Sequence, residues 1–274
     1  MYMPKFTITN KILRNIGVIE ACREVIDKAP LLPYYEKQFR DDALVRTVHY
    51  GTHIEGNELN IDQAENVIMG KDVVARQRDI QEVINYRMVM RYIEDMEESK
   101  RVKPGLPAGR ESESIINESL IKELHKLTVK KILSQENIGE YRKKQVVVKN
   151  SYTGKVSFKP PLSVAIPFQV KDLVVFINSK SEQDIHPVLK SGVVHYELVR
   201  IHPFLDGNGR VARALSTLIL FLEGYDIRKF FSLEEYFDKE TVMYYEALQS
   251  VEKNDGDLTK WLEYFTQGLS IELS

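Results

Sequence analysis

Apolar residues recur at helical spacing along most of this chain, and this pattern restricts its fold more than any other feature. Between residues 79 and 96 they share one face of a helix, at Ile80, Val83, Ile84, Met88 and Tyr92. Further helices are predicted over residues 18–27, 33–50, 116–133, 170–178, 187–200, 207–222, 239–252 and 258–267. The sequence therefore predicts a mainly α fold.

One segment departs from the helical pattern and predicts a β-hairpin. Residues 145–148 are rich in β-branched side chains, residues 150–154 are turn formers, and residues 155–158 can form a returning strand. Pro160 and Pro161 would end that strand. We expect a single hairpin in an otherwise helical protein.

The distribution of prolines and glycines suggests where the chain divides. Residues 99–114 carry both residue types among charged side chains, which is typical of a loop or a boundary. We therefore expect an N-terminal helical region over 1–100, a loop over 101–115 and a helical core with C-terminal helices over 116–274.

Composition narrows the class of protein. The 38 Lys and Arg residues nearly balance the 40 Asp and Glu residues, whereas proteins that bind nucleic acid usually carry a basic surplus. The only cysteine is Cys22, which excludes an intramolecular disulfide and a cysteine metal cluster and fits a reducing compartment. The longest apolar stretch, around residues 215–222, is too short to span a bilayer. We expect a cytoplasmic protein with no nucleic-acid or membrane partner.

A candidate anion site lies in residues 202–213. Pro203 disfavours helical geometry for the residue before it, so one helix should end near residue 201 and another should open after Asp206. The segment Gly207-Asn208-Gly209 would then lie at a helix N-terminus, where free N–H groups and the helix dipole attract an anion.

Charged side chains surround this predicted N-terminus. Arg210 and Arg213 follow one turn apart and can bind the same polyphosphate. Asp206 can hold Mg²⁺ that also contacts phosphate, and His202 can act as a general base toward a hydroxyl. Ordinary alternatives exist, such as an N-cap for Asp206 and a structural role for His202, whereas Phe204 is expected in the core in either case. Their combination within twelve residues favours a site.

The segment His-Pro-Phe-Leu-Asp-Gly-Asn-Gly-Arg-Val-Ala-Arg resembles the signature of the Fic family, H-x-F-x-[D/E]-G-N-G-R-x-x-R, at every fixed position. The resemblance extends roughly over residues 35–267 and implies a Fic-fold helical bundle with one β-hairpin flap. It also implies a protein adenylyltransferase, in which a Ser, Thr or Tyr hydroxyl of a target protein attacks the α-phosphate of ATP and accepts AMP.

By position, the resemblance assigns roles to the signature residues. His202 is the base, and Asp206 holds Mg²⁺. The residues that bind ATP phosphates are Gly207, Asn208, Gly209, Arg210 and Arg213.

The predicted hairpin, preceded by Gly139-Glu140-Tyr141-Arg142, resembles the family's flap, which lies over the active site and pairs with the target backbone. Val147, Val148 and Lys149 would then line the groove for nucleotide and target. A plain surface hairpin is the alternative. Tyr244 lies in a stretch similar to the family's helix beside adenine, and either stacking on the base or a core role is open.

Residues 51–57 resemble the family's inhibitory motif, [S/T]-x-x-x-E-[G/N]. The resemblance implies that Glu55 pairs with Arg213 and misplaces the γ-phosphate, because one guanidinium cannot fully serve a carboxylate and a phosphate. Gly51 departs from the motif at its first position, with Thr52 one residue later. A helix C-terminus around Gly56 is the ordinary interpretation, and both can hold.

Other functions stay open. Fic relatives also remove AMP from proteins, and the retained Glu55 could orient a water for that reaction. Other relatives transfer phosphate or phosphocholine, and the disrupted segment that marks the kinase-type relatives is intact here at residues 207–210. A nucleotide-sensing regulatory protein with little catalysis is the alternative of another class. The expected partner is a target protein docked on the hairpin, with self-modification and a homodimer also open.

Overall fold

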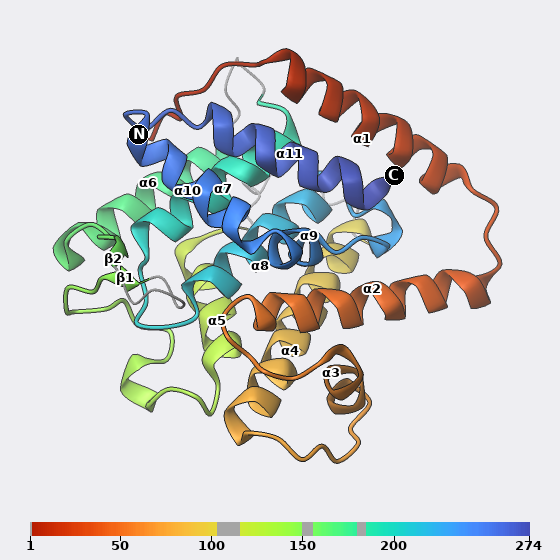
Figure 1. Cartoon of the computed structure of the whole chain (residues 1–274). Coiled ribbons are helices and arrows are strands. Elements are labelled where there is room, and N and C mark those ends of the chain that lie inside the picture. Colours follow the sequence, from red (N-terminus) through yellow and green to blue (C-terminus); the bar gives the residue numbers. More distant parts are fainter. Residues whose placement is uncertain (1, 103–115, 150–155, 180–184) are drawn as a thin grey trace.

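The computed structural model describes residues 2–102, 116–149, 156–179 and 185–274 (Figure 1). Within these ranges the chain is mainly helical, as predicted. Its α-helices are α1 Asn10–Lys28, α2 Pro33–His53, α3 Ile61–Ile68, α4 Gln77–Val102, α5 Glu118–Val129, α6 Ile166–Asn178, α7 Pro187–Ile201, α8 Asn208–Leu222, α9 Leu233–Lys239, α10 Thr241–Lys253 and α11 Thr259–Leu273. Short 3-10 turns are η1 Gln135–Asn137, η2 Ser163–Ala165 and η3 Ile227–Lys229. No helix of the described segments combines the length and apolarity needed to cross a membrane.

Helices α7 and α8 form the centre of the fold. Nearly every residue of α8 is buried, and the Ser191 and Ser216 hydroxyls lie 2.7 Å apart between the two helices. Helix α11 approaches α7 at Gly192, where an added Cβ would lie 2.9 Å from Leu262. The Trp261 indole also donates to the Gly192 carbonyl over 2.7 Å. This close packing makes α7 and α8 a rigid base for the turn that joins them.

The N-terminal helices pack onto this centre. Helix α1 runs alongside α11, α2 contacts α9, and α4 contacts both α5 and α8 (Figure 1). Of the predicted loop over residues 101–115, residues 101 and 102 belong to α4 and the rest lies outside the described residues.

Two helices were not predicted. Helix α3 begins with a capping box, in which Asn60 and Gln63 each bond the other's backbone N–H. Helix α9 is N-capped by the Ser232 side chain, which accepts from the N–H of Glu235. Helix α1 also begins earlier than expected, because Thr9 caps it at Ile12. These short cap motifs were the signals available in the sequence.

The β structure is shorter than predicted. Strands β1 (Val148–Lys149) and β2 (Val156–Phe158) pair antiparallel, with Val148 opposite Phe158. Residues 145–147 lie outside the ladder, where the Gln145 side chain donates to the Pro160 carbonyl over 2.8 Å. The predicted turn at 150–154 falls outside the described residues.

Candidate active site

The turn between α7 and α8 forms as the proline and glycines predict. Helix α7 ends at Ile201, and His202 has the left-handed angles φ 50° and ψ 59°. Gly207, at φ 78°, is the N-cap of α8, and a Cβ there would lie 3.0 Å from Val129. Glycine is therefore required at this cap, both for its backbone angle and for lack of space. His202, which is not a glycine, must be held in its conformation by its surroundings.

Core contacts hold the turn from within. The Asn208 side chain accepts from the Phe204 N–H and donates to the Phe204 carbonyl, both over 2.9 Å. The fully buried Phe204 ring stacks on His125 at 3.8 Å between centroids. Phe204 is thus a core residue.

His125 supports the site and was missed from the sequence. Its Nε2 lies 3.2 Å from the Asp206 carbonyl, and its Nδ1 accepts from the N–H of Gly139 over 2.9 Å. These partners define a neutral tautomer that donates from Nε2. Burial lowers the pKa of His125 to about 4, which keeps it neutral. A lone histidine on a helix face carries no sequence signal for such a role.

Glu55 lies over the N-terminus of α8. Its carboxylate accepts from Nη2 of Arg213 over 2.8 Å, and Arg213 is 2% exposed. A Cβ on Gly209 would lie only 2.1 Å from the same carboxylate oxygen. Burial of the Arg213 guanidinium lowers its pKa, but the Glu55 carboxylate beside it outweighs this effect, and the pKa of Arg213 is raised. An acidic side chain therefore occupies the position at which a helix N-terminus would bind an anion.

The departure from the inhibitory motif at Gly51 has a structural reason. A Cβ at Gly51 would lie 2.4 Å from the ring of Tyr86. The Tyr86 hydroxyl donates to Glu234 over 2.9 Å, and the Gly51 carbonyl accepts from Arg213 over 2.8 Å. Tyr86 thus fills the space that a Ser or Thr side chain would need. Thr52 turns inward and donates to helix carbonyls of α2.

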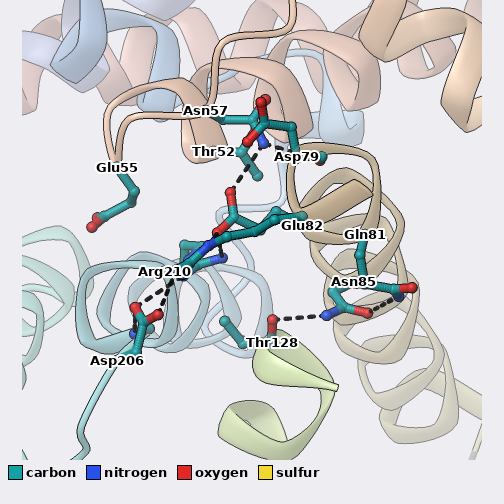
Figure 2. A network of polar contacts seen from close by, with 12 residues as sticks. Thr52, Glu55, Asn57, Asp79, Gln81, Glu82, Asn85, Thr128, Asp206 and Arg210 are labelled. Atoms are coloured by element: carbon teal, nitrogen blue, oxygen red, sulfur yellow. Dashed lines mark hydrogen bonds and ion pairs between the residues drawn. The ribbon is translucent and has the colours of Figure 1, made fainter. Parts of the chain in front are cut away.

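Arg210 is held by two acids (Figure 2). It lies 3.2 Å from Asp206 and 3.4 Å from Glu82, and it is 1% exposed. Glu82, on α4, also accepts from the Asn57 side chain over 3.0 Å. Glu82 therefore connects the segment that carries Glu55 to Arg210 of the signature. Glu82 carried no sequence signal, because it lies between the apolar positions of the helix predicted over residues 79–96.

Both oxygens of the Asp206 carboxylate contact a guanidinium. Oδ1 accepts from Arg210, and Oδ2 accepts from Arg78 over 2.7 Å. Although burial raises the pKa of Asp206, these charges and the Gly207 N–H lower it, so the group is ionised. In the part of the chain that the structure describes, no three His, Cys, Asp or Glu residues surround a common metal position. A single carboxylate beside an anion site still suits Mg²⁺, which takes its other ligands from phosphate and water.

A pocket opens between α7, α10 and the strands. The signature contributes His202 and Gly209 to its lining, and Glu55 borders it. Its other walls are largely apolar, formed by Val148, Phe158, Tyr196, Val199, Arg200, Tyr244, Tyr245, Leu248, Gln249 and Glu252. Burial lowers the pKa of His202, so its imidazole is neutral near pH 7. A neutral imidazole at the mouth of an apolar pocket can accept a proton from a bound hydroxyl.

Of the other predicted site residues, Val148 and Tyr244 line this pocket and Val147 does not. Val148 lines it, Val147 is 44% exposed and is not among the lining residues, and the Lys149 side chain lies outside the described residues. Tyr244 borders the pocket but is 2% exposed. Its hydroxyl bonds His195 Nε2 over 2.9 Å. Tyr244 is thus mainly part of the aromatic core.

Comparisons with known proteins agree with this geometry. Residues 115–220 match the model of the Fic/DOC family. Protein adenylyltransferase fic-1 of Caenorhabditis elegans is 30% identical over 180 residues, which cover 65% of this chain and 32% of that protein. Protein adenylyltransferase Fic of Drosophila mojavensis is 27% identical over 191 residues, covering 69% and 34%. The chain thus spans about a third of the length of these curated relatives.

Solved structures share the whole architecture. A Fic family protein from Desulfovibrio desulfuricans superposes with a TM-score of 0.80 at 26% identity, over 99% of this chain and 75% of that chain. A Fic domain containing signaling protein from Bacteroides thetaiotaomicron shares the fold, with a TM-score of 0.74 at 23% identity over 96% of this chain and 94% of that one. The signature turn and the pocket beside it thus lie in a chain whose residues 115–220 match the Fic/DOC family and whose fold is shared with a solved Fic family protein.

Proposed function

We propose that this chain is a protein adenylyltransferase that transfers AMP from ATP to a Ser, Thr or Tyr hydroxyl of a protein target. The observation that carries the proposal is the pocket at which neutral His202 and the α8 N-terminus at Gly209 meet. The names of the curated relatives support the same activity.

The reaction follows from the residues at the pocket. The target hydroxyl loses its proton to His202, and its oxygen forms a bond to the α-phosphorus of ATP. The bond from the α-phosphorus to the bridging oxygen of the β-phosphate breaks, and pyrophosphate leaves with that electron pair. Arg210, Arg213 and the N–H groups of α8 stabilise the phosphate charge, so catalysis rests on positioning and electrostatics. Mg²⁺ held by Asp206 would neutralise charge on the same phosphates.

The pocket and the adjacent ribbon also offer positions for the adenine ring and for the target protein. Adenine fits an apolar wall such as that formed by Val199, Tyr245 and Leu248. The target backbone would extend the ribbon of β1 and β2 by β-augmentation, with Val147 and Lys149 beside it. This is the flap role that the resemblance implies.

We infer that Glu55 holds the enzyme in a weakly active state. Its carboxylate uses Arg213 and covers the α8 N-terminus at Gly209, both of which the γ-phosphate side of ATP would need. Wild-type protein is therefore expected to transfer AMP only weakly, both to its targets and to itself.

The test is mass spectrometry of a lysate incubated with ATP and the Glu55→Gly variant. We expect AMP-mass additions on specific peptides, few of them with wild type and none when His202→Ala is added. Glu58→Gly is a matched control, because Glu58 is exposed and pairs with Arg76 away from the pocket. No AMP addition by Glu55→Gly would refute the activity, and equal labelling by wild type and Glu55→Gly would refute the brake.

AMP removal is the second candidate, favoured by the presence of Glu55 at the pocket, where it can orient a water. Wild-type protein incubated with a pre-AMPylated target would then release AMP, and Glu55→Gly would not. A nucleotide-sensing role without catalysis would give ATP binding and no product from either protein.

Use of ATP and the single Cys22 support a cytoplasmic location.

A further inference from the structure

Arg142 joins three separate segments next to the pocket. Its guanidinium donates to three backbone carbonyls: from Nε to that of His202 over 2.8 Å, from Nη1 to that of Lys144 over 3.1 Å and from Nη2 to that of Pro161 over 2.6 Å. Its own backbone N–H donates to the Pro203 carbonyl over 2.8 Å. The residue is 2% exposed, so water does not compete for these bonds.

The four carbonyls that accept from Arg142 belong to two elements, the β1–β2 ribbon and the turn after α7. Lys144 precedes β1 and Pro161 follows β2, so one guanidinium holds both ends of the ribbon. The other two acceptors are consecutive carbonyls of the turn that carries the base. His202 has a left-handed backbone, φ 50°, that a residue other than glycine adopts only when its surroundings hold it. Arg142 supplies two of the bonds that hold this turn.

The charge of Arg142 needs a separate explanation. Each acceptor is a neutral carbonyl, and among the described residues no carboxylate lies within ion-pair distance of the guanidinium. Burial lowers the pKa of Arg142, as expected for a cation without an acidic partner. Such burial is costly, so a positive charge here is expected to have a use beyond hydrogen bonding.

The charge acts on the base. Burial is the main cause that lowers the pKa of His202, and the charge of Arg142 lowers it further. The Val199 carbonyl, Glu55 and Asp206 all act in the opposite direction. The charge of Arg142 opposes these groups and favours the neutral, proton-accepting imidazole.

We propose that Arg142 is a positioning residue that fixes the His202 backbone and both ends of the β1–β2 ribbon as one unit. Its charge also favours the neutral form of the His202 imidazole. This inference rests on the proposed function. It makes Arg142 the link between the element that presents the target and the residue that deprotonates it.

The experiment compares Arg142→Gln and Arg142→Lys in the Glu55→Gly protein. The His202 ring is titrated by NMR, with its signal assigned through His202→Gln, and self-labelling with radioactive ATP is followed against pH. Arg142→Gln removes the charge and should raise the pKa of His202, moving the acid limb of labelling to higher pH. Arg142→Lys keeps the charge but loses the fork, so the pKa should stay while kcat falls about 10- to 100-fold. ATP affinity should stay within about twofold in both, because the phosphate-binding residues are intact.

Ser163→Ala is the matched control. Its hydroxyl donates to the Lys143 carbonyl over 3.1 Å, a bond at the base of the same ribbon that does not involve His202. It should leave the pKa of His202 and kcat unchanged. An unchanged His202 titration in Arg142→Gln overturns the proposal, as does a kcat of Arg142→Lys within twofold of its parent. If Arg142→Gln does not fold, Arg142→Lys decides alone. Absence of labelling in the Glu55→Gly parent would instead count against the adenylyltransferase function, and the NMR titration would still test Arg142.

Discussion

The carboxylate of Glu55 binds Arg213 at 2.8 Å, although 158 residues separate the two in the chain. Arg213 is almost wholly buried, so its guanidinium cannot turn away to serve a second anion while Glu55 is in place. A phosphate at Arg213 would therefore compete with this carboxylate for the Nη2 donor.

Glu55→Gln is expected to tighten ATP binding by about tenfold, the size of one charge-assisted hydrogen bond released to the ligand. Titration calorimetry measures it. AMP serves as the control ligand, because it lacks the outer phosphates that would reach Arg213, and its affinity should not change. Equal gains for AMP and ATP would show that Glu55 blocks the nucleotide pocket in general instead.

Arg78→Ala is expected to lower the Mg²⁺ concentration for half-maximal labelling by about two- to fivefold, measured in the Glu55→Gly protein. Arg78 donates to the Asp206 oxygen that a metal would need, and the contact is half exposed and thus weak. Calorimetric Mn²⁺ binding in the presence of ATP gives a readout independent of activity.

Arg76→Ala is the control for Arg78, since Arg76 is similarly exposed but pairs with Asp79. It should leave the metal requirement unchanged. A higher Mg²⁺ requirement or weaker ATP binding in Arg78→Ala would mean that Arg78 is a phosphate ligand and not a competitor of the metal.

Gly51→Ser is expected to lower the free energy of unfolding by about 1–3 kcal/mol, as overpacking of a core does. The new Cβ would lie 2.4 Å from the buried ring of Tyr86, which has little freedom to move. Urea denaturation measures the change. Gly17→Ala is the control, because Gly17 is helical with nothing within 4 Å of its added Cβ. This change should stabilise α1 by about 0.5–1 kcal/mol. A Gly51→Ser protein as stable as wild type would contradict the packing explanation for the altered motif.

The stability of the protein should fall as the pH drops from about 6.5 toward 4, in part through His125. Its pKa is about 4 in the folded protein, below the value of 6.5 that is usual for a histidine in an unfolded chain. Between these two pH values His125 is protonated in the unfolded chain but neutral in the folded protein, so its protonation favours unfolding. The loss from this group is absent above about pH 7, reaches about 3 kcal/mol at pH 4 and is complete below about pH 3.

Urea denaturation at several pH values measures this dependence. His125→Gln keeps a donor and an acceptor but cannot titrate, so its unfolding free energy should fall less with pH than that of wild type. Parallel curves for the two proteins would show that His125 is not responsible.

The signature turn could be predicted from the sequence because its determinants are local. Pro203 ends one helix, Gly207 permits the left-handed cap of the next, and the two arginines follow on the first turns of α8. Helical periodicity predicted most helices for the same reason, since each depends on residues three or four apart. Helix α3 was missed because it is short, although a capping box marks its start.

The contacts that control the site were decided by tertiary structure. The sequence placed Glu55 on Arg213 only through a family resemblance. It contained no indication that Arg78 contacts Asp206, 128 residues away, or that Arg142 holds the His202 carbonyl, 60 residues away. Hydrogen bonds and ion pairs between helices leave no periodic pattern, because a single polar side chain at the right height on a packed helix suffices. The packing of α4 against α8 brings Arg78 to Asp206, and the hydrogen bonds between Arg142 and the turn after α7 bring the other pair together.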